Sequence, residues 1–138
     1  MKYYDVVIIG AGVTGAWISY ELGKRKCSVC VLEKESDICE GTSKANSAIV
    51  HAGYDPEPGS LMAKLNVRGN ELIRERNKSL SIPFKEIGSL VVAFDEEGMR
   101  KVEELYAKGK FNGVEGLKIL NREETLELEK SLNPDILG

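Results

Sequence analysis

The sequence Gly10-Ala-Gly-Val-Thr-Gly15 separates an apolar run from an amphipathic run, and this arrangement restricts the fold more than any other feature. The apolar run, residues 3–9, is rich in β-formers and predicts a strand buried on both faces of a parallel sheet. Residues 13–25 carry apolar side chains four positions apart and predict a helix. Residues 28–33 predict a second buried strand. Together these elements predict a right-handed β-α-β unit.

Each glycine of this G-x-G-x-x-G sequence has a physical role in dinucleotide binding. Gly10 permits the tight turn out of the strand, Gly12 lets a pyrophosphate approach the backbone, and Gly15 lets the helix pack closely on the sheet. The helix N-terminus then offers unpaired N–H groups to the phosphates. Glu33, 18 residues after Gly15, lies where a carboxylate is expected to accept hydrogen bonds from ribose hydroxyls, and its charge disfavours a 2′-phosphate. The alternative is a structural turn followed by a surface glutamate.

Residues 34–59 are rich in Gly, Ser, Asn, Asp and Pro and show little regular pattern. Such a length is unusual for an ordinary connection, so these residues predict a functional loop. Small hydroxyl residues and backbone N–H groups in Gly41–Ala48 suit phosphate binding and the lining of a flavin ring system, which favours FAD over NAD. A plain polar surface loop is the alternative.

The rest of the chain predicts three helices and two strands. Ser60 is the expected N-cap of a helix over residues 61–78. Asp95 opens a second helix, and the pair Asn121 and Glu124 resembles a capping box ahead of a third. The expected strands are Phe84–Phe94, broken near Gly88, and Leu117–Leu120.

Composition excludes several classes of protein. The 138 residues include 19 basic and 22 acidic side chains, and 42% are apolar, which argues against a disordered chain and against a nucleic-acid partner. No apolar run is long enough to span a membrane, and Asp5 interrupts the one segment that resembles a signal peptide. Three cysteines do not form a disulfide framework, and we expect no metal site. These features predict a cytoplasmic protein.

The sequence resembles the D-amino-acid-oxidase-like superfamily of FAD-dependent oxidoreductases. Within it, the nearest likeness is to the L-2-hydroxyglutarate oxidase and anaerobic-type glycerol-3-phosphate dehydrogenase branch. The glycine sequence is shared by many families, whereas the segment Asn46–Tyr54 is much more selective. The segments that carry the resemblance are Gly10–Gly15, Glu33-Lys34, Asn46–Tyr54, Pro58–Leu65, Gly88–Leu90 and Leu126–Pro134.

The resemblance implies a cofactor, a reaction and a set of site residues. The family oxidises a C–H group that bears a hydroxyl or an amine, by hydride transfer to FAD. A small anionic hydroxy compound, such as glycerol 3-phosphate or a 2-hydroxy acid, is the expected substrate. The residues implied to hold the ADP half are Gly10, Gly12, Gly15 and Glu33. Those implied along the pyrophosphate and towards the isoalloxazine are Lys34, Thr42, Ser43, Asn46 and Ser47. The alternatives are an amine or amino-acid oxidase of the same superfamily, and a non-catalytic binding module that keeps the nucleotide-type fold.

His51 is the chain's single histidine, and the resemblance places it near the reactive face of the flavin. An unperturbed imidazole titrates near neutral pH, so it suits a base that takes the substrate's hydroxyl proton. Two other roles stay open: a covalent link to the flavin, and a hydrogen-bonded structural histidine.

The expected fold is α/β. Residues 1–78 should form the N-terminal part of a Rossmann-like FAD-binding domain, and residues 79–138 should begin a second, α+β substrate-binding domain. Because the resemblance implies a later strand and a C-terminal segment, we expect an incomplete piece whose first partner is the rest of its own polypeptide. We expect this piece alone to be inactive and to associate or be poorly stable. A homo-oligomer and an electron-acceptor protein are further partners left open.

Overall fold

A computed structural model describes residues 1–138, which divide into two compact units, Met1–Ile49 and Val50–Gly138. Each unit is described by itself below. The predicted domain boundary after residue 78 stays a prediction. None of the helices combines the length and the apolar character that a membrane crossing requires.

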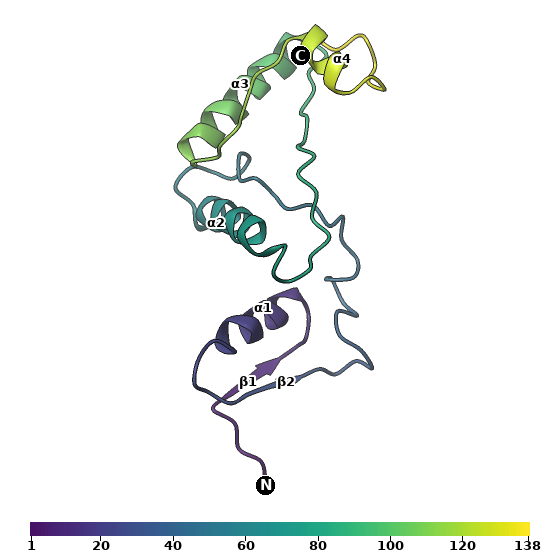
Figure 1. The fold of residues 1–138 in the computed structure, drawn as a ribbon. Coiled ribbons are helices and arrows are strands. Elements are labelled where there is room, and N and C mark those ends of the chain that lie inside the picture. The colour runs from purple at the N-terminus through teal and green to yellow at the C-terminus, as the bar shows by residue number, and fades with distance from the viewer. The chain divides into compact units, whose positions relative to one another are not determined.

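The first unit is a β-α-β unit. Strand β1 (Val6–Ile9), helix α1 (Val13–Leu22) and strand β2 (Val29–Leu32) follow one another in the chain. The two strands pair in parallel, with Val6 opposite Val29, and α1 packs along both of them (Figure 1). The sequence prediction of a parallel β-α-β unit is therefore confirmed.

The prediction that both strands are buried on both faces is wrong for this unit. Ile8 is buried, whereas Ile9 is 89% exposed and Leu32 is 53% exposed. The reason is that α1 covers one face of a sheet that has only two strands. The strands therefore carry more apolar side chains than this unit buries.

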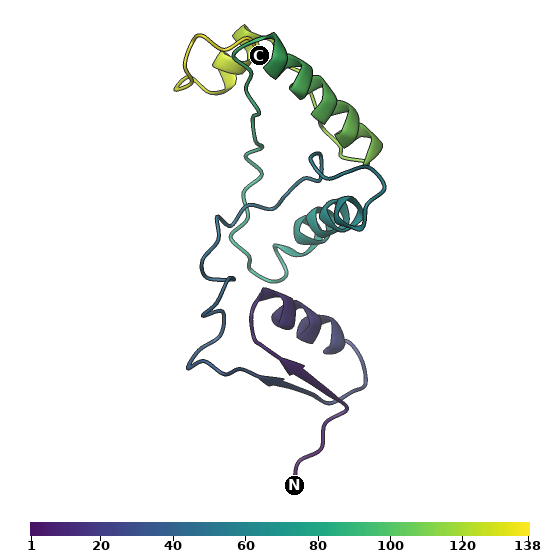
Figure 2. The same ribbon diagram turned by 180° about the vertical axis from the view of Figure 1, so that it is seen from behind.

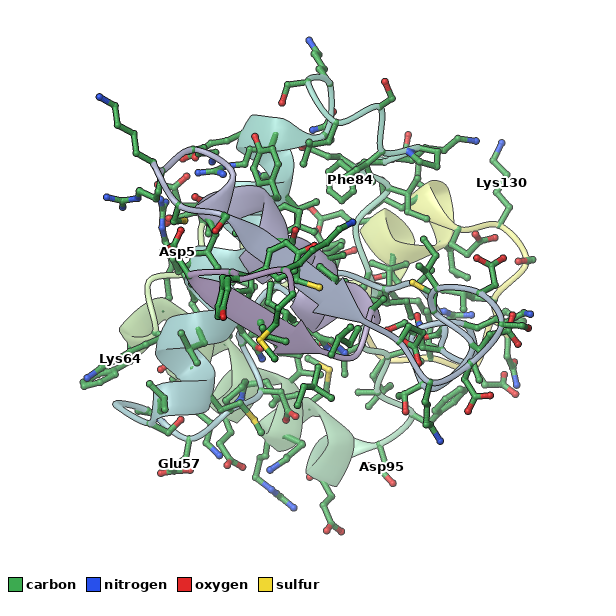
Figure 3. All side chains as sticks on the ribbon, turned by 90° about the horizontal axis from the view of Figure 1, so that it is seen from below. Asp5, Glu57, Lys64, Phe84, Asp95 and Lys130 are labelled. Atoms are coloured by element: carbon green, nitrogen blue, oxygen red, sulfur yellow. The ribbon has the colours of Figure 1, made fainter.

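Asp5 joins the beginnings of the two strands (Figure 3). Its Oδ2 accepts hydrogen bonds from the backbone N–H and from the hydroxyl of Ser28, both at 2.7 Å. The bond from the Ser28 backbone N–H, followed by the hydroxyl bond, lowers the pKa of Asp5. The ionised carboxylate therefore fixes the register at this end of the sheet.

The second unit contains the helices α2 (Leu61–Arg76), α3 (Glu96–Phe111) and α4 (Arg122–Leu128). Each begins at a side-chain cap, since Ser60, Asp95 and Asn121 accept bonds from backbone N–H groups of the first turn. Asn121 forms a full capping box with Glu124. The predicted caps at Ser60 and Asn121 are confirmed. Asp95 is marked in Figure 3, where it lies at the start of α3.

The two strands expected in the second unit are absent. Residues 84–94 and 117–120 have no regular secondary structure. The segment between α2 and α3 is an extended coil, and Figure 2 shows no strand there. A strand needs a neighbour that shares its backbone hydrogen bonds. Only Ala93 finds one, by exchanging bonds with Gly138 at 3.0 Å and with Leu137 at 2.7 Å. The small core of the unit consists of Ala63, Ala93, Val114, Thr125 and Ile136.

Candidate functional site

The glycine loop between β1 and α1 has the geometry that its sequence predicts. Gly10 has a φ of +99°, which favours glycine, and its N–H donates to the Leu32 carbonyl at 2.7 Å. A Cβ at Gly15 would collide with the Gly10 carbonyl oxygen and would lie 3.3 Å from Ile8 Cγ2. The two glycines therefore allow the sharp turn and the close approach of α1 to the sheet.

The N-terminus of α1 presents backbone donors. Gly12 is the N-cap and has no side chain to accept from the first turn. The Val13 N–H donates to Ser43 Oγ at 2.8 Å, whereas the N–H groups of Gly12 and Thr14 donate to no group in the chain. Free amides at a helix N-terminus attract anions, because the helix dipole adds a partial positive charge there.

Glu33 lies directly against this loop. Its Oε2 accepts a hydrogen bond from the Ala11 N–H at 2.7 Å. Its Oε1 accepts from the N–H groups of Lys34 at 2.8 Å and Glu35 at 3.2 Å. These backbone bonds, with that from Ala11 the strongest, lower the pKa of Glu33. A carboxylate has about four acceptor positions, so these three bonds leave room for about one sugar hydroxyl, and a second hydroxyl needs one of them to be exchanged.

Residues 34–49 fold back onto the glycine loop. The Cys39 N–H donates to the Ala11 carbonyl at 3.2 Å. The Asn46 amide donates to the carbonyls of Thr42 and Ser43, at 3.2 and 2.8 Å, and accepts from the Ala48 N–H at 2.7 Å. Asn46 therefore shapes the turn that carries Ser43, and Ser43 in turn contacts the first helical turn.

A hollow of about 320 Å³ lies beside the loop and is lined by Gly12, Glu33, Lys34, Ser43 and neighbouring residues of the segment 34–43. Small-ligand sites span about 300 to 1,000 Å³, so this hollow suits a part of a dinucleotide. Lys34 is largely exposed and its Nζ lies 3.0 Å from Glu35 Oε1. A larger hollow, about 500 Å³, follows the charged face of α3 and contains no predicted site residue.

His51 belongs to the second unit. Its side chain is exposed and has no hydrogen-bond partner in the chain, while its carbonyl accepts from Asn70 Nδ2 at 3.2 Å. Ser47, in the first unit, is also exposed and unpartnered. The structure thus gathers Gly10, Gly12, Gly15, Glu33, Lys34, Thr42, Ser43 and Asn46 around one loop of the first unit.

Sequence reasoning missed two asparagines of the second unit. Asn70 contacts His51, and Asn112 donates to the carbonyls of Gly53 and Pro56 at 3.0 and 2.9 Å. No motif could have indicated Asn112, because its partners lie 59 and 56 residues away along the chain.

Comparison with known proteins gives the family. Residues 5–138 match the family model described as FAD dependent oxidoreductase. The chain belongs to this family. The resemblance seen in the sequence is confirmed, and so is the expected α/β class with a Rossmann-like parallel unit.

Individual relatives are similar along nearly the whole chain. A glycerol 3-phosphate dehydrogenase of Caloramator mitchellensis is 48% identical over 135 residues, which are 98% of this chain and 28% of that protein. A mitochondrial L-2-hydroxyglutarate dehydrogenase of Dictyostelium discoideum is 38% identical, over 94% of this chain and 30% of that protein.

A solved structure supports the fold. The dithionite-reduced L-α-glycerophosphate oxidase of Mycoplasma pneumoniae, with FAD bound, superposes with a TM-score of 0.75 at 36% identity. The match covers 99% of this chain and 36% of that one. The chain therefore spans roughly a third of the length of the relatives that it matches.

Proposed function

We propose that this chain supplies the N-terminal, cofactor-binding part of an FAD-dependent dehydrogenase or oxidase that acts on a small anionic hydroxy compound. The observation that carries the proposal is the glycine loop, which leaves the amides of Gly12 and Thr14 without partners at the start of α1. This donor set suits a pyrophosphate. Membership of the FAD dependent oxidoreductase family selects FAD among dinucleotides.

The first unit would hold the ADP half of the cofactor. Gly10 and Gly15 allow the tight turn of the loop. The free backbone N–H groups of Gly12 and Thr14 would donate to the phosphates, and the missing side chain at Gly12 lets them approach. Ser43 now accepts from Val13 at 2.8 Å, and its hydroxyl can also donate to a phosphate oxygen. Glu33 would accept one ribose hydroxyl at its remaining acceptor position and a second in exchange for a backbone bond. Lys34, Thr42, Asn46 and Ser47 complete the proposed cofactor-binding set.

We assign proton transfer to His51. FAD supplies the hydride acceptor when it is bound. A base must take the hydroxyl proton as the carbon is oxidised, and a neutral imidazole suits this task near pH 7. The exposed His51 imidazole has no partner within the chain, which supports this role over a hydrogen-bonded structural one.

For the substrate we favour glycerol 3-phosphate, because this chain is 48% identical to a relative named glycerol 3-phosphate dehydrogenase. L-2-hydroxyglutarate is the second candidate, supported by relatives of that name at 37–40% identity. Both are small hydroxylated anions. An electron-acceptor protein and a homo-oligomer stay predictions, and the three free cysteines support the predicted location in the reducing cytoplasm.

The complete protein that contains this chain tests the proposal. We expect the purified protein to show flavin absorbance and to lose this colour anaerobically with glycerol 3-phosphate, faster than with L-2-hydroxyglutarate, glycine or sarcosine. His51→Ala should slow the reduction about 100-fold or more while flavin content stays the same. A colourless protein that takes up no FAD would favour the non-catalytic binding module. Bleaching by glycine or sarcosine alone would favour the amine-oxidase alternative.

A further inference from the structure

The segment His51–Pro56 runs between α2 and α3 in both views of the second unit (Figures 1 and 2). Each helix contacts this segment in the same way. One position makes a close packing contact, and an asparagine three residues later donates to a carbonyl of the segment. This repeated arrangement is not needed for either helix, because both have their own caps.

On the α2 side, the packing contact is between Gly53 and Val67. Gly53 has a φ of +101° and is buried, and a Cβ there would lie 2.8 Å from Val67 Cγ2. Asn70, one turn further along α2, donates from Nδ2 to the His51 carbonyl at 3.2 Å. The helix therefore fixes both the residue that carries the imidazole and the glycine two positions after it.

On the α3 side, the packing contact is between Gly109 and Tyr54. A Cβ at Gly109 would lie 2.9 Å from Tyr54 Cβ, so only glycine lets the chain approach this closely. Asn112 then donates from Nδ2 to the carbonyls of Gly53 and Pro56, at 3.0 and 2.9 Å. One side chain thus fixes both ends of the turn around Tyr54.

The orientation of the Asn112 amide is decided by its surroundings. With the opposite assignment, its oxygen would face two carbonyl oxygens, which cannot donate. In the observed orientation, Oδ1 is buried without a hydrogen-bond partner. A buried unsatisfied oxygen destabilises a fold, so it calls for a specific explanation. Helix capping does not provide one, since the backbone N–H of Asn112, not its side chain, bonds to α3.

We propose that Asn112 is a positioning residue for His51. By holding the carbonyls of Gly53 and Pro56, it fixes the turn that follows His51 and so the place of the imidazole. The inference rests on the proposed role of His51 in proton transfer. A displacement of about 1 Å of a reacting group can slow a reaction about 100-fold, so a bond two residues away has a measurable effect.

Asn112→Ala tests the inference, and Asn77→Ala is the matched control. Both asparagines are C-caps of 16-residue helices in the right-handed conformation, but the Asn77 amide donates only to Arg74 of its own helix. In the complete flavoenzyme, Asn112→Ala should slow flavin reduction about 10-fold through kcat, with KM and flavin content little changed. Asn77→Ala should leave all three quantities unchanged.

A second readout does not depend on activity. Chymotrypsin cleavage after Tyr54, identified by mass spectrometry in the cofactor-free protein, should be about 10-fold faster in Asn112→Ala than in Asn77→Ala, because the turn loses two of its restraints. Equal cleavage of the two variants would overturn the claim that Asn112 holds the turn. If Asn112→Ala does not fold, Asn70→Ala removes the half-exposed bond to His51 from the other helix and should give the same changes to a smaller extent.

A double-mutant cycle separates positioning of His51 from a general loss of structure. In a His51→Ala background, Asn112→Ala should cost no further rate, since the group that it positions is gone. A full additional 10-fold loss would overturn the inference. If the parent enzyme binds no flavin, or His51→Ala alone leaves the reduction rate unchanged, the proposed function fails first, and these two results are visible before Asn112 is changed.

Discussion

Two irregular segments of this chain differ sharply in how they are held. Residues 34–49 bond to the glycine loop through Cys39 and Ser43 and to themselves through Asn46. Residues 85–92 lie between the bonded positions Phe84 and Ala93 and make no backbone hydrogen bond. Both segments lack regular structure, yet only the first has backbone hydrogen bonds, and the second has an ion pair, between Glu86 and Arg74 at 3.8 Å.

Backbone hydrogen bonds slow local opening even where a segment has no regular secondary structure, so the two segments should differ in protection from exchange. The first segment is polar and meets the amides and carbonyls of the glycine loop. The second segment carries exposed apolar side chains, with Ile87 87% exposed and Val91 45% exposed, and it shares no hydrogen bond with a neighbouring backbone. Amide hydrogen exchange should therefore be slow at Cys39 and fast throughout residues 85–92.

The largest expected change comes from Gly15→Ala. The added Cβ would collide with the Gly10 carbonyl, and α1 has to move away from the turn that residues 34–49 contact. We expect a loss of about 3 kcal/mol in the stability of the first unit. Hydrogen exchange should accelerate across residues 34–49 and stay unchanged in residues 85–92.

Gly69→Ala is the matched control, because Gly69 lies within α2 and a Cβ there meets nothing within 4 Å. Alanine favours the helix over glycine by up to about 1 kcal/mol, so this variant should be slightly more stable. Normal exchange at Cys39 in Gly15→Ala would show that residues 34–49 do not depend on the glycine turn.

The next effect depends on pH. Backbone bonds, that from Ala11 first, lower the pKa of Glu33 in the folded chain below its ordinary value of 4.5, so its contribution is present above that value and is lost as the pH falls through the lowered one. Protection of residues 34–49 should therefore decrease in acid. In Glu33→Gln this protection should be weaker near neutral pH and change less on acidification, as measured by hydrogen exchange at several pH values.

Asp5→Asn provides the comparison for this experiment. The pKa of Asp5 is also lowered, chiefly by the Ser28 backbone bond, but this bond lies at the far end of the strands from the glycine loop. Its loss should speed exchange at Ser28 and not at Cys39. A pH dependence at Cys39 that is the same in Glu33→Gln and in the unchanged chain would remove Glu33 as its cause.

The predictable part of the molecule is the part with local physical causes. The β-α-β unit follows from two apolar runs and three glycines, and the caps at Ser60 and Asn121 follow from the hydrogen-bonding needs of a helix N-terminus. The strand predicted at residues 84–94 is wrong because its formation does not depend on local causes. Its apolar sequence is typical of a strand, but a strand forms only where a segment distant in the chain supplies backbone hydrogen bonds.

The long-range contacts at the glycine loop of the first unit and in the turn after His51 of the second unit show the same limit. The glycine sequence located the loop and Glu33, but the bond of Ser43 to Val13 crosses 30 residues, and that of Asn112 to Gly53 crosses 59. Serine and asparagine are common in loops, so their types alone do not indicate which backbone groups they reach. Such long-range bonds depend on the fold and not on the local sequence.

The smallest expected effect is that of Ile87→Ser in residues 85–92, the segment without backbone hydrogen bonds. The Ile87 side chain is 87% exposed and contributes little to packing. The free energy of unfolding of residues 1–138 should therefore change by less than about 0.5 kcal/mol. The same substitution in the complete protein makes the comparison decisive, with unfolding measured in denaturant for both. A loss of about 2 kcal/mol in the complete protein alone would mean that Ile87 is buried there against another segment, as expected for an apolar side chain that gains a covering neighbour. Equal, small effects in both would mean that the Ile87 side chain stays exposed in the complete protein as well.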